Sequence, residues 1–238
     1  MIKENKMESA LLSPADFFDL ADCPFPELLK DIKYVWEMVP RIARFLENWE
    51  RWEIKGKVMD GAFVKGKVFI GSDAVVEPGA YVIGPVVIGS RTVVRHGAYI
   101  RGNVVAGSGC IIGHTTEVKN SIFLDGAKAA HFAYVGDSIL GRNVNLGAGT
   151  KLANSKIQAG REKIVIRAEG KKYPTGLRKL GAILGDGVEL GCNCVTAPGT
   201  LIGPHTLVYP CTSLRGVIPP NSIVKTKQSL QIVEREDY

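Results

Sequence analysis

Residues 58–118 read VMDGAFVKGKVFIGSDAVVEPGAYVIGPVVIGSRTVVRHGAYIRGNVVAGSGCIIGHTTEV, and every sixth position of this stretch is apolar. These positions are Val58, Val64, Ile70, Val76, Val82, Ile88, Val94, Ile100, Ala106, Ile112 and Val118. The same spacing returns at Leu140, Leu146 and Leu152, and again between Leu184 and Leu214. A period of six fits neither the 3.6-residue turn of an α-helix nor the two-residue alternation of an ordinary strand.

A second column accompanies the first. The residue four positions after each sixth-position aliphatic is mostly small or β-branched, as at Ala62, Ala74, Ala80 and Ala98. This pattern predicts a coil of three short strands joined by three corners, with about eighteen residues per coil. The aliphatic side chain points into the coil, and the small residue packs beside it. We therefore predict an all-β fold, a parallel β-helix of hexapeptide repeats over residues 54–220.

Residues 1–53 have a different, helical pattern. Ser13 to Asp16 read SPAD, which is typical of a helix start, and a second start follows near Pro26. Apolar residues then recur at spacings of three and four, at Ile32, Val35, Trp36, Val39, Ile42, Phe45, Leu46 and Trp49. We expect Pro40 to kink or split this stripe. The segment is predicted to be a helical cap over the first coil, with a partner-binding arm as the alternative.

Residues 153–182 interrupt the repeat. Lys163–Ala168 predicts a strand, Glu169-Gly170 a turn and Lys171–Tyr173 a short return strand. The stretch from Asn154 to Lys179 holds eight basic and two acidic residues, so its net charge of +6 equals that of the whole chain. We predict an inserted basic hairpin that projects from the β-helix and helps to hold an anionic ligand. Residues 221–238 are predicted to be a C-terminal tail.

Composition excludes several classes. No apolar run reaches the roughly 20 residues that a membrane span needs, and residues 1–7 lack the apolar stretch of a signal peptide. We therefore expect a cytoplasmic protein with no membrane partner. Nucleic acid is not an expected partner either, because the basic residues are local and lack interleaved aromatics. The five cysteines form no CxxC pair, which favours reduced thiols over a disulfide framework or a zinc ribbon.

The most specific motifs are HFAYVGD at residues 131–137 and NVNLGAGT at residues 143–150. With the repeats from about residue 88 to 218, they resemble the C-terminal acetyltransferase domain of the bifunctional glucosamine-1-phosphate acetyltransferase/N-acetylglucosamine-1-phosphate uridylyltransferase. Related domains occur in archaeal and bacterial sugar-1-phosphate nucleotidylyltransferases. The resemblance implies a left-handed β-helix, a homotrimer with its site between subunits, and acetyl-CoA as co-substrate. It implies N-acetylation of an amino-sugar 1-phosphate, either glucosamine-1-phosphate or galactosamine-1-phosphate, with no metal required.

The same resemblance assigns site residues. His131 matches the family's general base, a role that suits a neutral imidazole because it can accept the proton of an attacking amine. Asn145 matches a catalytic position that contacts the acceptor. The residues that match acceptor-binding positions are Arg101, Lys119, Tyr134, Asn154 and Lys179. Arg101 lies 18 residues before Lys119, so the two cations are expected to stack on one face and to suit a phosphate. For coenzyme A the resemblance points to Ala148, Cys192, Tyr209 and Pro210.

Two alternatives remain open. The family continues its motif with Asn-Tyr-Asp-Gly, whereas this chain has Asn154-Ser155-Lys156 and then the insertion. A non-catalytic subunit that binds a sugar nucleotide or a partner nucleotidylyltransferase is therefore the main alternative. The chain has no Gly-rich nucleotide loop, so we do not expect uridylyl transfer by the chain itself. A γ-type carbonic anhydrase is a second alternative, because His96 and His114 lie one coil apart, but its short His-x4-His spacing is missing.

Overall fold

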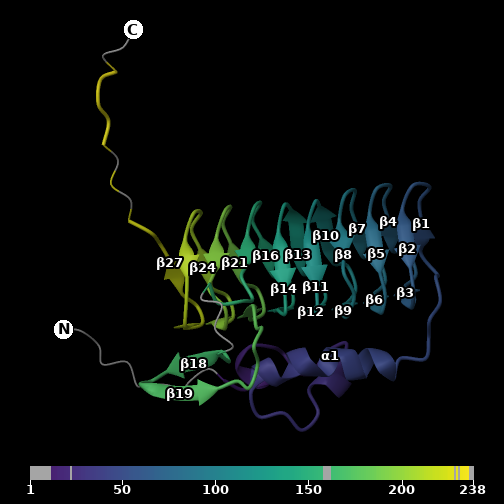
Figure 1. The fold of residues 1–238 in the computed structure, drawn as a ribbon, viewed down its shortest axis with the longest axis horizontal. Helices are drawn as coiled ribbons and strands as arrows, with labels where there is room; N and C mark the ends of the chain where they lie inside the picture. The colour runs from purple at the N-terminus through teal and green to yellow at the C-terminus, as the bar shows by residue number, and fades with distance from the viewer. Residues whose placement is uncertain (1–11, 22, 158–161, 228, 230, 236–238) are drawn as a thin grey trace.

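The computed structural model of the protein describes residues 12–21, 23–157, 162–227, 229 and 231–235. In these residues the chain winds into a parallel β-helix whose short strands stack along one axis as three sheets (Figure 1). The predicted fold class, an all-β hexapeptide-repeat β-helix with a helical N-terminal segment and an inserted hairpin, is confirmed. Each turn of the chain contributes one strand to each sheet in succession, which is the arrangement that the period of six requires.

The three sheets divide the strands in strict rotation. The first sheet contains β1 (Lys57–Val58), β4 (Val75–Val76), β7 (Val93–Val94), β10 (Ile111–His114), β13 (Lys128–His131), β16 (Asn145–Leu146), β21 (Glu189–Leu190), β24 (Leu207–Val208) and β27 (Ile223–Val224). The second contains β2 (Phe63–Lys65), β5 (Tyr81–Ile83), β8 (Tyr99–Ile100), β11 (Glu117–Lys119), β14 (Tyr134–Gly136), β17 (Lys151–Leu152), β22 (Val195–Thr196) and β25 (Ser213–Leu214). The third contains β3 (Val68–Ile70), β6 (Val86–Ile88), β9 (Val104–Ala106), β12 (Ser121–Phe123), β15 (Ile139–Leu140), β20 (Ala182–Leu184), β23 (Thr200–Ile202) and β26 (Val217–Ile218).

The interior is filled by the sixth-position aliphatics. Ile88, Ile100 and Ile112 are fully buried, as the sequence pattern predicts. Two consecutive coils have 17 residues instead of 18, because Ser121 pairs with Val104 and Ile139 pairs with Ile122. The residue is lost at the corner between the second and third sheets.

The N-terminal segment is helical, as predicted, but in short pieces. It contains three single turns of 3₁₀-helix, η1 (Pro14–Asp16), η2 (Pro26–Leu28) and η3 (Val35–Glu37), followed by α1 (Met38–Glu47). Pro40 is the third residue of α1 and neither kinks nor splits it, because the first turn of a helix needs no donor at that position. No helix in the described residues is long and apolar enough to cross a membrane.

Helix α1 lies along the third sheet (Figure 1), rather than over the first coil where we expected it. The reason is a row of apolar residues on the outer face of that sheet. This row is buried and consists of Val87, Val105, Ile122, Ile139, Ile183 and Leu201. Trp36, Ile42 and Leu46 pack in the same cluster. A sheet that is apolar on both faces must be covered on both, and the N-terminal segment supplies the cover.

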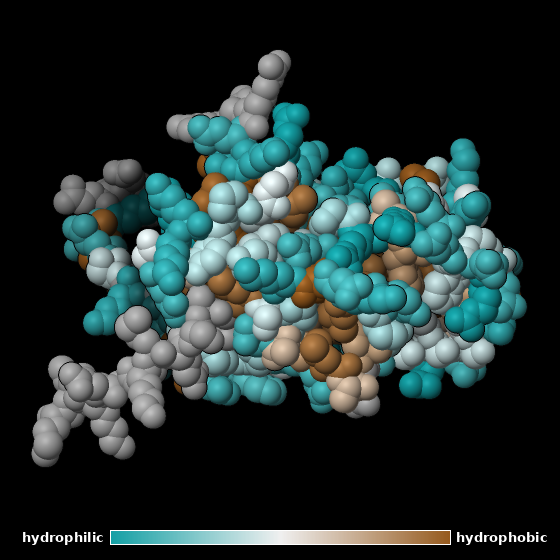
Figure 2. All heavy atoms as spheres, turned by 90° about the horizontal axis from the view of Figure 1, so that it is seen from below, coloured by the Kyte–Doolittle hydropathy of each residue, from teal (hydrophilic) through white to brown (hydrophobic). Residues whose placement is uncertain are grey.

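The predicted hairpin is present as β18 (Val165–Ala168) and β19 (Lys171–Pro174), which pair antiparallel. It does not simply project into solvent, because Ile164 and Ile166 are buried in the same cluster as α1. The Tyr173 ring also contacts that of Tyr34 at 5.9 Å between centroids. Seen from the side that carries α1 and the hairpin, the surface is largely hydrophilic, with smaller hydrophobic patches (Figure 2).

Candidate functional site

The HFAYVGD motif crosses from the first sheet to the second. His131 is the last residue of β13 and Tyr134 the first residue of β14, and Phe132 turns the corner between them with a φ of 51°. His131 pairs with His114 of the preceding coil, and its side chain is exposed. Gly149 N–H donates to the His131 carbonyl at 3.1 Å, which ties this corner to the following coil. An exposed imidazole at a corner is open to a ligand, as a general base has to be.

A buried carboxylate, Asp137, organises the next corner of the same coil. Asn120 Nδ2 donates to Asp137 Oδ1 at 2.7 Å, and Asn154 Nδ2 donates to Asp137 Oδ2. Lys119 Nζ lies 3.7 Å from the same Oδ2. We call Lys119, Asn120, Tyr134, Asp137 and Asn154 the Asp137 cluster. Hydrogen bonds to a carboxylate are strong, so the two amides are held in fixed positions, and Lys119 adds an ion pair.

Tyr134 joins the cluster over a glycine. A Cβ atom built on Gly136 would lie 2.7 Å from both the Tyr134 hydroxyl and Asn154 Nδ2, so both groups pack directly over the Gly136 backbone. The pKa of Tyr134 is raised above its ordinary value, first by burial and then by the carboxylates of Glu117 and Asp137. The phenol is therefore held in its neutral, hydrogen-bonding form.

Arg101 and Lys119 lie in the predicted register. Tyr99 pairs with Glu117 and Ile100 with Val118, so the two cations follow at equivalent positions of adjacent coils. Each of the two cations has a carboxylate partner, however. Arg101 Nη1 lies 2.6 Å from Glu117 Oε1, and Lys119 has the Asp137 carboxylate as its partner. The hydrogen bond to Glu117 also raises the pKa of the Arg101 guanidinium.

Asn154 and Lys179, the predicted substrate-binding residues at the two ends of the insertion, lie in or beside this cluster. Asn154 is a buried member of it. Lys179 is exposed, and the two residues after it bond to the cluster's backbone. Leu180 N–H donates to the Asn154 carbonyl at 3.1 Å, and Gly181 N–H donates to the Asp137 carbonyl at 2.8 Å. The insertion thus returns to its starting point and positions Lys179 next to the Asp137 cluster.

Asn145 is not brought to the cluster. It is the first residue of β16 and is exposed on the first sheet, whereas the Asp137 cluster lies on the second sheet and its corner. Its backbone pairs with Lys128 in the preceding coil and with Glu189 in the following one.

The residues matched to coenzyme A binding continue the corner that carries His131. Ala148, Cys192 and Pro210 follow the buried residues Leu146, Leu190 and Val208, which stack in register. Asn193 N–H donates to the Ala148 carbonyl at 2.8 Å, and Cys211 N–H donates to the Cys192 carbonyl at 2.8 Å. Cys192, Tyr209 and Pro210 are all exposed. The half-buried Ala148 and these three exposed residues therefore lie along one continuous edge with His131 at one end.

Sequence reasoning missed three members of this arrangement. Asp137 was part of the quoted motif but received no role, and Glu117 and Asn120 were not singled out. Asp137 had a readable signal, because a carboxylate directly after the glycine of the motif is not required by the repeat. The pairing of Glu117 with Arg101 depends on side-chain geometry across two coils and has no signal in the sequence.

The described residues contain no group of three or more His, Cys, Asp or Glu side chains close enough together to hold a metal ion. His96 and His114 do stack, with ring centroids 5.5 Å apart. Each Nδ1 lies within hydrogen-bond distance of a carbonyl one coil earlier, that of Pro78 at 2.7 Å and that of His96 at 3.0 Å. These contacts give both rings a structural role in the corner.

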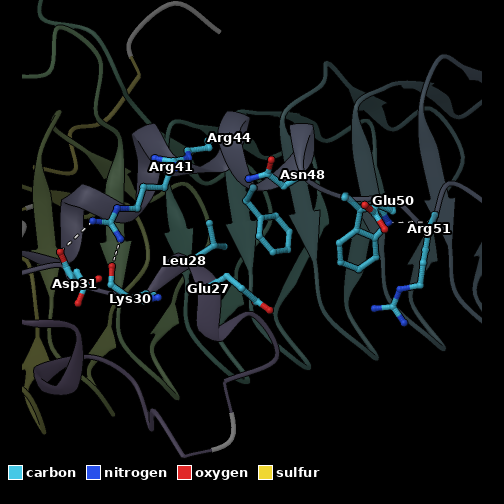
Figure 3. Close-up of a pocket in the computed structure, with 11 residues that line it drawn as sticks. Glu27, Leu28, Lys30, Asp31, Arg41, Arg44, Asn48, Glu50 and Arg51 are labelled. Atoms are coloured by element: carbon cyan, nitrogen blue, oxygen red, sulfur yellow. Dashed lines mark hydrogen bonds between the residues drawn. The ribbon is translucent and has the colours of Figure 1, made fainter.

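A hollow of about 760 Å³ lies elsewhere, between the η2 loop and α1 (Figure 3). Arg41 points across it and donates to the main-chain carbonyls of Lys30 and Asp31. The Arg51 guanidinium lies 5.1 Å from the centre of the Trp49 ring. None of the predicted site residues lines this hollow.

Comparison with known proteins identifies relatives of the β-helical part. Residues 82–207, more than half of the chain, match the profile of the family described as GMPPB C-terminal domain. The chain is 44% identical over 207 residues to a protein named bifunctional protein GlmU from Methanococcus maripaludis strain C7, covering 87% of this chain and 49% of the relative. It is 36% identical over 180 residues to a bifunctional sugar-1-phosphate nucleotidylyltransferase/acetyltransferase from Sulfurisphaera tokodaii, covering 76% of this chain and 44% of the relative.

The chain thus spans about half the length of these curated relatives. Among solved structures, a UDP-N-acetylglucosamine acyltransferase from Francisella novicida is similar with a TM-score of 0.46 and 16% identity. That similarity covers 69% of this chain and 62% of the other.

Proposed function

The chain belongs to the GMPPB C-terminal domain family, and from that membership we propose that it is an acyltransferase of the hexapeptide-repeat type. The reaction we propose is transfer of an acetyl group from acetyl-CoA to the amine of an amino-sugar 1-phosphate. The acetyltransferase named in the Sulfurisphaera relative supports this class of reaction. One observation supports the proposal: the exposed His131 ends β13, Tyr134 of the Asp137 cluster begins β14 three residues later, and the edge that runs to Cys192 and Pro210 begins in the next coil, where Gly149 N–H donates to the His131 carbonyl.

In the chemical step His131 acts as general base. Its imidazole takes a proton from the acceptor amine as the nitrogen attacks the carbonyl carbon of the thioester. The new C–N bond forms, the C–S bond breaks, and the sulfur leaves with a proton as the free thiol of coenzyme A. No covalent intermediate on the protein is needed. The amine and the thioester must be held close together, which is the contribution of the residues around His131.

The acceptor's phosphate is proposed to bind at Arg101 and Lys119. Arg101 presents five N–H donors, and its hydrogen bond to Glu117 uses Nη1, so the rest of the fork faces the phosphate oxygens in this proposal. Tyr134 and Asn154 offer a neutral hydroxyl and an amide to the sugar. Lys179, the exposed cation at the end of the insertion, adds to the positive potential at this place.

Coenzyme A is proposed to lie along the corner that carries Ala148, Cys192, Tyr209 and Pro210. This corner is exposed and runs straight from His131 because successive coils stack in register. A ligand chain laid along it would have its thioester at the His131 end. The remaining basic residues of the inserted segment are available for the phosphates of coenzyme A.

A homotrimer would complete the site. Asn145 is exposed on the first sheet and the Asp137 cluster lies on the second, so a single acceptor would reach both where the first sheet of one copy faces the second sheet of another. Closed cyclic assemblies of identical chains are common. The Sulfurisphaera relative is named both a nucleotidylyltransferase and an acetyltransferase, and from that name we propose a nucleotidylyltransferase as a further partner.

Release of free thiol from acetyl-CoA tests the proposal. Purified protein is offered glucosamine-1-phosphate, galactosamine-1-phosphate, or the same sugars without phosphate. We expect thiol release that requires the amino-sugar phosphate. Folded protein that releases no thiol with either phosphate would overturn the proposal and favour a non-catalytic sugar-nucleotide-binding or assembly subunit.

A further inference from the structure

A column of exposed aromatic rings lies on the outer face of the second sheet. Phe63 pairs with Tyr81, and Tyr81 pairs with Tyr99, so the three rings stand above one another in consecutive coils. Their centroids are 5.9 and 5.8 Å apart, and the residues are 61%, 39% and 38% exposed. We call these three residues the aromatic column. Contiguous exposed rings on a rigid sheet are a marker of a binding surface.

The aromatic column is continuous with the proposed acceptor site. The Arg101 guanidinium lies 5.8 Å from the centre of the Tyr99 ring. Tyr99 pairs with Glu117, and Glu117 pairs with Tyr134, so a single straight row leads from the column to the sugar-binding tyrosine. Arg101 and Lys119 flank this row in the two coils between Tyr81 and Tyr134. The order along the row is therefore three aromatic rings, then Glu117, then Tyr134, with Arg101 beside Tyr99 and ion-paired to Glu117, and Lys119 beside Glu117.

That order fits an acceptor longer than a sugar 1-phosphate. Neighbouring strands are about 4.8 Å apart, so Tyr99 lies about 10 Å and Tyr81 about 14 Å from Tyr134 along the sheet. A sugar at Tyr134 with its phosphate at Lys119 and Arg101 leaves the column uncovered. A nucleoside diphosphate sugar continues further, with a second phosphate for the second cation and then a nucleoside. Aromatic side chains bind bases of any identity by stacking.

We propose that the aromatic column binds the nucleoside of an acceptor in which the amino sugar is carried on a nucleoside diphosphate. This inference rests on the proposed acyl transfer and extends its substrate class. In it the amine still attacks at His131, both phosphates lie at Arg101 and Lys119, and the base lies against Tyr99 and Tyr81. A second copy of the chain is the other candidate occupant of the column, and the experiment separates the two.

The test compares two acceptors, glucosamine-1-phosphate and UDP-glucosamine, in the wild type and in Tyr81→Ala. We expect Tyr81→Ala to lower kcat/KM for UDP-glucosamine by about tenfold, the scale of one lost base–ring stack, and to leave glucosamine-1-phosphate unchanged. Tyr81→Phe keeps the ring and should behave as the wild type. Val195→Ala changes an exposed residue of the same sheet, four coils beyond Tyr99, and should affect neither acceptor.

Binding of uridine diphosphate, measured by calorimetry, makes the result independent of turnover. Binding of uridine diphosphate to the wild type, and its loss in Tyr81→Ala, supports the aromatic column as a nucleoside site. If the same protein transfers no acetyl group, the proposed function is overturned and the inference about the column stands. Acetylation of the sugar 1-phosphate without any uridine diphosphate binding overturns the inference and leaves the function intact. Dissociation of an oligomer by Tyr81→Ala, seen by light scattering, also overturns it and assigns the column to a second copy.

Discussion

Asn120 and Asp137 occupy the same corner of two adjacent coils, and Asn120 Nδ2 donates to Asp137 Oδ1 at 2.7 Å. Both residues have positive φ, 44° and 49°, at the place where the coil is one residue short. Asn and Asp tolerate this conformation better than other non-glycine residues. At this shortened corner the carboxylate of Asp137 contacts Lys119 and Asn154, where it can position groups of the proposed acceptor site.

Asp137→Asn should lower both stability and affinity for the acceptor. The substitution removes the charge that holds Lys119 and leaves donors facing a neutral amide. We expect a loss of about 2–3 kcal/mol in the free energy of unfolding and a rise of roughly tenfold in KM for the sugar phosphate. Urea unfolding and steady-state kinetics measure the two effects.

The matched control for that variant is Asp125→Asn. Asp125 accepts a hydrogen bond from Ser108 N–H at 2.7 Å, at a corner away from the Asp137 cluster. It should lower stability with little change in KM. Equal KM changes in both variants would show that Asp137 has no specific role in the site.

Gly136→Ala tests the packing of Tyr134 and Asn154. The added Cβ would lie 2.7 Å from both the Tyr134 hydroxyl and Asn154 Nδ2, which are ends of side chains and can move aside. We expect modest loss of stability and a clear rise in KM for the acceptor. Gly113→Ala is the contrast, because its Cβ would meet the Ala130 carbonyl oxygen at 1.8 Å and should lower Tm far more. An unchanged KM for the acceptor in Gly136→Ala would show that Tyr134 does not contribute to acceptor binding.

The raised pKa of Tyr134 predicts a specific alkaline behaviour. An unfolded tyrosine ionises near pH ~10, whereas burial and the carboxylates of Glu117 and Asp137 keep the folded phenol protonated to higher pH. The stability from this group is therefore complete below the unfolded pKa and is lost as pH rises through the folded pKa. Wild type and Tyr134→Phe should differ by a constant Tm up to about pH 10, after which the wild type falls faster. Parallel Tm curves across that range would contradict the shift.

Thr196→Val should stabilise the β-helix. Thr196 stands at an inward position, and its buried Oγ1 has no hydrogen-bond partner among the described residues. Replacing the hydroxyl by a methyl group removes a desolvated polar atom at almost constant volume, for a gain of about 1 kcal/mol. Thr116→Val is the control. Thr116 Oγ1 donates to the Ala129 carbonyl at 3.1 Å, so this variant should be less stable than the wild type. A loss in both variants would mean that the Thr196 hydroxyl has a partner.

The fold was predictable because its signal is repeated in every coil. The sixth-position aliphatics fixed the interior, and the 18-residue interval placed Arg101 over Lys119 in the register that the structure has. The shortened corners at Asn120 and Asp137 were not predicted, because one residue can be lost at a corner without changing which side chains face inward. The cover provided by α1 was also missed. Its signal lies in the third-sheet strands, where Val87 and Val105 stand between inward-facing apolar residues and are themselves apolar, so both faces of the sheet are apolar.

The site was predictable only in part for a related reason. The residues of the HFAYVGD motif fall at two successive corners and on the second-sheet strand between them, and the stacking of coils that the sequence period implies places the other motif beside them. The partners of the two cations, Glu117 and Asp137, depend on how side chains cross between coils. No spacing rule encodes that, so only the structure shows that Arg101 and Lys119 of the proposed acceptor site are each paired with a carboxylate.

The most direct test of the account is the rate of acetyl transfer by His131→Ala with saturating acetyl-CoA and amino-sugar phosphate. His131 is exposed, so the variant should fold with an unchanged Tm. The account predicts that kcat falls by roughly 10²–10⁴, the usual contribution of a general base, while KM for the acceptor stays within a few-fold of the wild type. A folded variant that keeps more than about a tenth of the wild-type kcat would contradict the assignment of His131 as the base.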